Sequence, residues 1–198
     1  MSTLDTDVYQ TRQPEAAADE QFIQRWSPRA FAGDPLSEDQ AAVLFEAARW
    51  SPSCFNSQPW RFIYGLKGTE HFDALLALLM DMNQLWAKDA GALIAVVAKT
   101  TFDNGDAAPT YAFDTGSAWM ALALQAQSMG LASHAMWGFH HDHAPGALKL
   151  PEDYAVMAMV AVGAPGDVSD LPEKYQEREV PSPRKSLSEI AMPGVFQG

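Results

Sequence analysis

The run Leu-Ile-Ala-Val-Val at residues 93–97 constrains the fold of this chain most, because it is apolar at every position. A strand with one solvated face alternates apolar and polar residues, whereas a short continuous apolar run is typical of a strand buried on both faces. Residues 156–162 form a second run of this kind, closed by Gly163. The sequence therefore predicts a sheet with buried strands.

Helical patterns are mixed with these strands, so the class is α+β or α/β. The first helix is expected to begin at Ser37, which can form a capping box with Gln40, and to end at Ser51-Pro52. The other expected elements are a short strand at 62–64, a leucine-rich helix at 71–80 and a long helix from about 114 to 129, followed by Gly130 as its cap.

The ends of the chain differ from this middle part. Residues 1–20 are polar and acidic, without the basic start and apolar run of a signal peptide, so we expect a poorly ordered tail. Residues 21–198 are expected to form one domain, which suits a chain of 198 residues. Its last part, 165–198, contains five prolines and is expected to be extended, lying over another part of the protein.

Charge and cysteine content exclude several classes of protein. The net charge of −12 makes nucleic acids and anionic membranes improbable partners, and no apolar stretch approaches the roughly 18 residues of a membrane helix. Cys54 is the single cysteine, which excludes an internal disulfide and fits a reducing cytoplasm. We therefore expect a cytoplasmic protein.

Two features, a group of histidines and the single cysteine, could carry chemistry but have simpler interpretations. His134, His140, His141 and His143 could contribute to a metal site, but no fitting further ligands stand out, and a polar loop is the preferred interpretation. Cys54 could be a nucleophile, but no histidine is near it in sequence, and a small packing residue is preferred. We predict no metal site. The chain also lacks the glycine-rich dinucleotide fingerprint, the triphosphate-binding loop and the G-x-S-x-G elbow.

Four segments are better candidates for binding. Residues 25–29, Arg-Trp-Ser-Pro-Arg, could grip a phosphate, because arginine forms bidentate, charge-assisted hydrogen bonds to such anions. Residues 51–62 form a stiff loop of small polar side chains that could bind the edge of a flat heterocycle. At 136–139, Met-Trp-Gly-Phe, a glycine would let the backbone approach a planar ligand. A second basic pair stands at Arg184-Lys185. Each segment alone could equally be an ordinary loop.

The order and spacing of these segments resemble the nitroreductase family of flavin mononucleotide (FMN) enzymes, from about Phe22 to Ile190. The most specific match is P-S-x-F-N-x-Q-P-W-R-F at residues 52–62. The N-terminal R-x-S-x-R, the D-x-G-x-A that starts at Asp114, the G-L-A and G-F segment and the C-terminal R-K-x-L-x-E-I follow in family order. The resemblance implies a three-layer α+β fold, with a mainly antiparallel sheet of four or five strands flanked by helices. It also implies an intertwined homodimer, in which the C-terminal tail reaches over the partner and two FMN molecules lie in the interface.

The resemblance also implies roles for particular residues. Arg25, Ser27 and Arg29 would bind the phosphate, ribityl chain and ring edge of FMN, and Arg184 with Lys185 would complete the phosphate clamp. Gly138 and its neighbour Trp137 would present a backbone N–H to the flavin N5. Asn83 stands where some members place a polar flavin contact. Four residues would come from the other subunit, namely Pro52, Ser53, Cys54 and Asn56.

Three positions depart from the family pattern. A second serine is usual where Cys54 stands, Ser186 replaces a common proline, and Trp86 stands where some members carry a lysine near the ring. We expect Trp86 and Trp137 to shape the substrate pocket.

The implied activity is hydride transfer from NADH or NADPH, through flavin N5, to a flat oxidised acceptor such as a nitroaromatic or quinone, in a ping-pong sequence. The flavin carries the chemistry, so no catalytic acid or base is assigned. Two alternatives stay open. One is a flavin-binding or flavin-delivery protein with little turnover, and the other is a different flavin chemistry such as ring oxidation or reductive dehalogenation.

Overall fold

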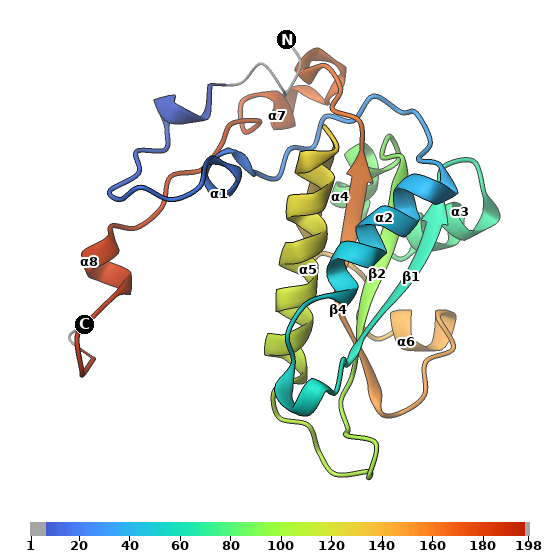
Figure 1. Cartoon of the computed structure of the whole chain (residues 1–198). Helices are drawn as coiled ribbons and strands as arrows, with labels where there is room; N and C mark the ends of the chain where they lie inside the picture. Colours follow the sequence, from blue (N-terminus) through green and yellow to red (C-terminus); the bar gives the residue numbers. More distant parts are fainter. Residues whose placement is uncertain (1–6, 197–198) are drawn as a thin grey trace.

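The structure is a computed structural model that describes residues 7–196. Its centre is a four-stranded sheet in which every neighbouring pair is antiparallel (Figure 1). The strands in spatial order are β1 (Trp60–Leu66), β2 (Ala92–Lys99), β4 (Tyr154–Gly163) and β3 (Ala132–Met136). The prediction of an α+β fold with a mainly antiparallel sheet is confirmed.

Strand β2 shows why the apolar run had to be buried on both faces. Successive side chains of a strand point to opposite faces of the sheet. Leu93, Ala95 and Val97 accordingly lie in one hydrophobic core. Ile94 and Val96 lie in the other core. The strand therefore joins two cores, and each core needs its own layer of helices.

Helices supply both layers (Figure 1). On one face, α2 (Glu38–Arg49) packs against α5 (Tyr111–Ser128), and both contribute to the core that contains Ile94. On the other face lie α3 (Glu70–Ala77), α4 (Asp81–Ala87) and α6 (Ala144–Ala147), which contribute to the core that contains Leu93. The expected three-layer arrangement is confirmed. No helix in residues 7–196 is long and apolar enough to cross a membrane.

Helix α2 begins where the sequence predicts. The Gln40 N–H donates to the Ser37 hydroxyl at 3.1 Å, and the Ser37 N–H donates to the Gln40 side chain at 3.0 Å. These two hydrogen bonds form the predicted capping box, which satisfies backbone donors that the first helical turn leaves free.

The helix expected at 71–80 ends earlier, at Ala77 in α3, and residues 78–80 divide it from α4, which begins at Asp81. The division occurs where the chain pairs with a distant segment. The Met80 N–H donates to the Gly138 carbonyl at 3.0 Å, and Leu79 forms an isolated bridge with Phe139. Backbone groups that are used in this pairing cannot continue a helix, so the division is a tertiary effect.

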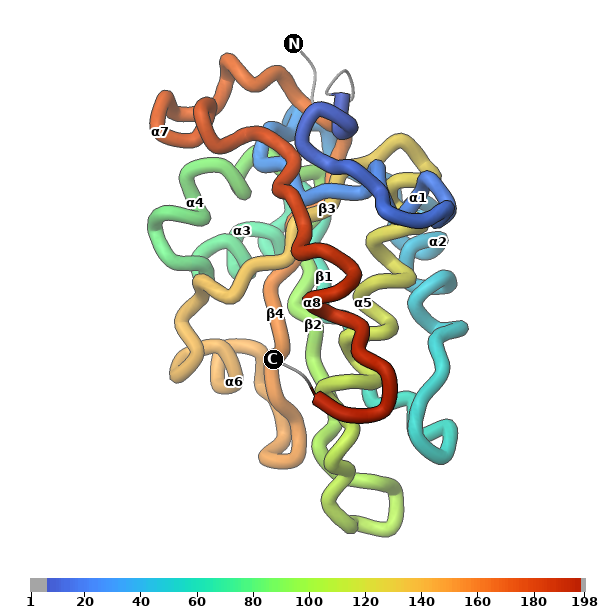
Figure 2. The backbone as a smooth tube through the Cα atoms, turned by 90° about the vertical axis from the view of Figure 1, so that its left-hand side faces the viewer, coloured from blue at the N-terminus to red at the C-terminus, as the bar shows by residue number. Residues whose placement is uncertain are grey.

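The C-terminal arm, residues 165–196, leaves the body of the protein and runs beside the N-terminal part of the chain (Figures 1 and 2). The arm contains two short helices, α7 (Glu173–Gln176) and α8 (Leu187–Ile190). Helix α8 forms because Ser186 and Glu189 make a second capping box, with hydrogen bonds of 3.0 and 2.9 Å.

The N-terminal segment, residues 7–18, belongs to the tail that we expected to be poorly ordered, and the structure describes it. It contains a short 3-10 helix, η2 (Val8–Gln10), and precedes α1 (Glu20–Gln24). The Leu187 N–H in the arm donates to the Glu15 carboxylate at 3.1 Å. Residues 1–6, the rest of the expected tail, lie outside the described part of the chain.

Candidate functional site

Arg25 and Arg184, which are far apart in sequence, lie close enough for their charges to interact. The Arg25 guanidinium donates to the Ser27 hydroxyl and to the Trp26 carbonyl, both at 3.2 Å. Burial and the nearby charge of Arg184 hold the pKa of Arg25 below its ordinary value. Neither arginine forms an ion pair with a carboxylate within residues 7–196. Two of the predicted anion-binding segments therefore form one cationic cluster.

Two cavities open beside this cluster. One has a volume of about 410 Å³, and its lining includes Arg25, Pro28 and Gln127. The other has a volume of about 560 Å³, and its lining includes Arg184 and Lys185. The N-terminal segment lines both cavities.

Arg29 is held differently, by the buried carboxylate of Glu179 in the arm. One Glu179 oxygen accepts hydrogen bonds from the backbone N–H groups of Arg29 and Ala30, the second at 2.8 Å. The other oxygen lies 3.6 Å from the Arg29 guanidinium. Glu179 is 4% exposed. Sequence reasoning missed it, because a glutamate in a polar, proline-containing tail gives no sign that it is buried.

His134 packs against the segment at residues 25–29. Its Nδ1 contacts the Pro28 carbonyl at 3.0 Å, and its ring lies 4.7 Å from the Trp86 ring. Burial lowers the pKa of His134 to about 4, and the charges of Arg29 and Arg25 act in the same direction. The ring is therefore neutral at pH 7. Within residues 7–196, no group of three or more His, Cys, Asp or Glu residues is arranged to hold a metal ion.

Asn83 and Gly138 form a second part of the candidate site. The Asn83 side-chain amide donates to the Gly138 carbonyl at 2.9 Å. A Cβ atom at Gly138 would lie 2.6 Å from that amide nitrogen, so only glycine fits here without a shift. The Gly138 N–H has no acceptor within the described range. The two residues predicted to contact the flavin, Asn83 and Gly138, are thus adjacent, and the Gly138 N–H is available to a ligand.

The two tryptophans that we expected at the substrate pocket behave differently. Trp137 is 69% exposed and packs against His141, whose ring lies 4.4 Å away and donates to the Trp137 carbonyl at 3.0 Å. Trp86 is 1% exposed and stacks on Phe31 in the core. The expectation is wrong for Trp86, because its ring is buried against the rings of Phe31 and His134.

Residues 52–56, the predicted flavin-edge loop, are fixed by the start of α5. They include the 3-10 turn η3 (Cys54–Asn56), in which Phe55 and Asn56 have left-handed φ values of 51° and 55°. The Cys54 N–H donates to the buried Asp114 carboxylate at 3.2 Å, and the Gln58 N–H donates to the Ser53 hydroxyl at 3.0 Å. A side chain–backbone network thus supports an otherwise unfavourable turn.

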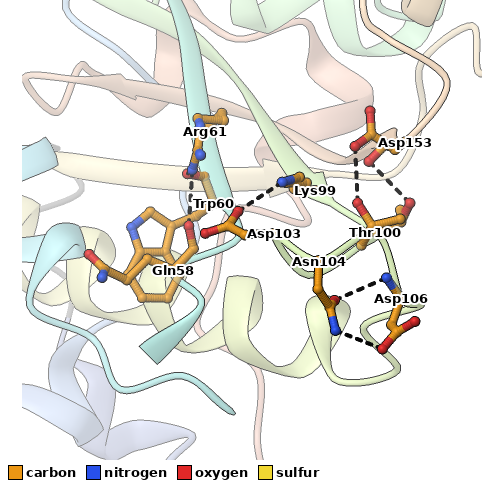
Figure 3. Close-up of polar contacts among 10 residues, drawn as sticks. Gln58, Trp60, Arg61, Lys99, Thr100, Asp103, Asn104, Asp106 and Asp153 are labelled. Atoms are coloured by element: carbon orange, nitrogen blue, oxygen red, sulfur yellow. Dashed lines mark hydrogen bonds and ion pairs between the residues drawn. The ribbon is translucent and has the colours of Figure 1, made fainter. Parts of the chain in front are cut away.

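Polar contacts also fix the segments beside this loop (Figure 3). The Arg61 guanidinium donates to the Gln58 carbonyl at 2.9 Å, and Lys99 pairs with Asp103 at 3.0 Å. The neighbouring loop carries Phe102, whose ring meets the exposed Phe55 ring at 6.0 Å. Both loops are therefore braced against the end of the sheet.

Residues 52–56 and the end of α1, which Arg25 follows, lie at opposite ends of α5 (Figure 1). Asp114, in the first turn of α5, holds the loop, whereas Gln127, near the end of α5, lines the cavity beside Arg25. An α-helix of 18 residues is about 27 Å long. Within one chain, the segment of Arg25 and the loop at residues 52–56 are therefore too far apart to contact the same ligand.

These features define an α+β protein with a helix-covered antiparallel sheet, a cationic cluster at one end and a braced polar loop at the other. A model of the Nitroreductase family matches residues 23–78 and 67–164. The chain belongs to the nitroreductase family, and it is an oxidoreductase of that family.

Individual relatives agree with this assignment. A crystal structure of an oxidoreductase containing FMN is 41% identical, with a TM-score of 0.91, and the match covers 94% of this chain and 96% of the other. Protein DrgA of Synechocystis is 30% identical over 72% of this chain and 81% of its own length. A NADH dehydrogenase of Thermus thermophilus is 26% identical over 83% of this chain and 92% of its own length.

Proposed function

We propose that this protein is an FMN-dependent enzyme that oxidises NADH or NADPH and reduces a flat acceptor such as a nitroaromatic or quinone. We further propose that it acts as a homodimer with two flavin sites in the interface. The observation that carries the proposal is the cationic cluster of Arg25 and Arg184, because it lies on the two segments that the family resemblance assigns to the FMN phosphate.

The residues present fit FMN on two counts. Burial and the nearby charge of Arg184 lower the pKa of Arg25, and neither arginine has a carboxylate partner in the described chain, so a bound phosphate would relieve the repulsion between the two charges. Gly138 leaves a backbone N–H without an acceptor beside Asn83. A ligand with an anionic end and a hydrogen-bond-accepting ring would satisfy both.

Each group of residues would have a separate role. Arg25, Ser27, Arg184 and Lys185 would hold the phosphate and the start of the ribityl chain. Arg29 would stabilise negative charge at the ring edge, and Glu179 keeps its guanidinium in place. Asn83, Trp137 and Gly138 would contact the ring. Pro52, Ser53, Cys54 and Asn56 would approach the ring from the partner subunit.

The proposed dimer follows from the separation of the two halves along α5. In a symmetric dimer, each chain can give its arginine cluster to one site and its loop to the other. The exposed apolar side chains agree with this arrangement, since Phe55 and Phe113 beside the loop and Ile190 and Phe196 in the arm are all more than half exposed in the single chain. Exposed apolar patches are typical of protein–protein interfaces, so we propose that these side chains contact the partner subunit.

When bound, FMN supplies two-electron transfer between the nicotinamide donor and the acceptor. The protein binds and orients the ring, and it excludes water where the partner's loop closes the site. The exposed Trp137 ring offers a flat surface for an aromatic acceptor. No side chain of the site is required to take or give a proton when the donor is oxidised.

An absorbance scan tests this function. The purified protein should be yellow, release FMN rather than FAD on heating, and lose its flavin absorbance when NADH or NADPH is added without oxygen. A colourless protein that does not take up FMN would overturn the proposal. A yellow protein that neither nucleotide bleaches would favour a flavin-binding or delivery function instead.

A further inference from the structure

The N-terminal segment places a buried arginine against both phosphate-binding segments. Arg12 is 8% exposed. One nitrogen of its guanidinium donates to the Ile23 carbonyl at 2.5 Å and to the Arg25 carbonyl at 2.8 Å, and its Nε donates to the Ser182 carbonyl at 3.2 Å. Figure 2 shows the N-terminal part of the chain beside the arm.

These three hydrogen bonds join the residues that precede or carry the proposed phosphate ligands. The Arg25 carbonyl belongs to one ligand itself, and Ser182 stands two residues before Arg184. A planar guanidinium has donors in fixed directions, so it can hold both backbones in one relative position. Without Arg12, no other described hydrogen bond links residues 182–184 to residues 23–25.

The charge of Arg12 also needs an explanation. Burial lowers its pKa, and the nearby charges of Arg184 and Arg25 lower it further. Joining two backbones requires hydrogen-bond donors, but it does not require a cation beside two other cations. A buried charge without a paired carboxylate is costly, and an anion shared by the three guanidinium groups would offset that cost.

We propose that Arg12 is a positioning residue for the phosphate of FMN: it fixes the segments of Arg25 and Arg184 relative to each other and contributes a third positive charge to the site. This inference rests on the proposed function, and it assigns the N-terminal segment to the cofactor site.

The test compares FMN with riboflavin, which has the same ring and ribityl chain but no phosphate. The apo-form of the full chain is titrated with each flavin, and flavin fluorescence reports binding. Arg12→Gln should weaken FMN binding about tenfold, the effect of losing hydrogen bonds and charge at an ionic site, and should leave riboflavin binding unchanged. Arg12→Lys, which keeps the charge, should lose less FMN affinity than Arg12→Gln.

Two further variants calibrate the result. Arg184→Ala, at a proposed direct phosphate ligand, should show the same selective loss of FMN. Lys67→Gln removes one positive charge in the turn between β1 and α3, where Lys67 pairs with Asp89, and should change neither affinity. If Arg12→Gln does not fold, Arg12→Lys tests the inference instead. The ratio of its FMN affinity to its riboflavin affinity should then be lower than the ratio in the wild-type protein.

Equal losses for FMN and riboflavin would overturn the inference, because Arg12 would then only support the fold. Unchanged FMN affinity in both Arg12 variants would overturn it as well. A wild-type protein that binds neither flavin would instead overturn the proposed function.

Discussion

The buried carboxylate of Asp114 accepts a hydrogen bond from the Cys54 N–H at 3.2 Å, which links the first turn of α5 to the loop at residues 52–56. The same oxygen accepts a hydrogen bond from the Thr110 hydroxyl at 2.9 Å. Asp114→Ala leaves both donors without their acceptor. We expect it to lower the free energy of unfolding by about 1.5–3 kcal/mol in urea denaturation, the usual range for hydrogen bonds to a charged group.

Two variants control this prediction. Asp114→Asn keeps an oxygen acceptor and should cost less than Asp114→Ala. Asp106→Ala removes an exposed carboxylate from the neighbouring loop and should change stability by no more than about 0.5 kcal/mol. If Asp114→Ala and Asp106→Ala had the same effect, the hydrogen bond to Cys54 would carry no stability.

Stability should depend on pH through His134. Its pKa is lowered to about 4 in the folded protein, whereas an unfolded histidine titrates near 6.5. Between these values the unfolded chain binds more protons, so stability should fall as pH decreases from about 6.5 to about 4, by at most about 1.4 kcal/mol per pH unit. His134→Gln should flatten this part of the stability profile.

The exposed His71 provides the matched control, since His71→Gln should leave the profile unchanged. Unfolding curves at several pH values for the three proteins measure the effect. Parallel profiles for wild type and His134→Gln would show that other groups cause the loss of stability in acid.

Steady-state kinetics should follow a ping-pong pattern if donor and acceptor use one face of the flavin in turn. Double-reciprocal plots against NADH or NADPH, at several fixed concentrations of a quinone acceptor, should then be parallel. Converging lines would mean that both substrates bind at once, which the shared site does not permit.

The local parts of the fold could be predicted from sequence, because they depend on neighbouring residues. The apolar run at 93–97 indicates burial on both faces, and Ser37 with Gln40 determines where α2 begins. The division between α3 and α4 could not be predicted in this way. It depends on pairing between Met80 and Gly138, which are distant in sequence.

The candidate site shows the same limit. The sequence indicates that Arg25 and Arg184 are unusual in an acidic chain, but their proximity depends on the course of the arm. The roles of Arg12 and Glu179 depend on burial among backbone groups from distant segments. Charged residues in polar, aperiodic segments carry no pattern that reports such burial, and this is why both were missed.

The central claim is that each flavin site combines two chains, and complementation between inactive variants tests it most directly. Arg25→Ala removes a ligand from the arginine cluster, and Asn56→Ala alters the loop at the other end of α5. Conditions are chosen in which neither homodimer retains FMN. The two chains are then unfolded, mixed in equal amounts and refolded, with a different tag on each to measure heterodimers.

In a heterodimer, one site carries both substitutions and the other carries neither. Random pairing makes about half of the dimers mixed, so about a quarter of all sites should be intact. We predict that bound FMN and NAD(P)H-dependent activity recover to about that fraction of wild type. If both residues served a site within one chain, every site would keep one substitution and no FMN binding would return. A mixture that contains heterodimers but recovers neither FMN nor activity would therefore contradict the shared site.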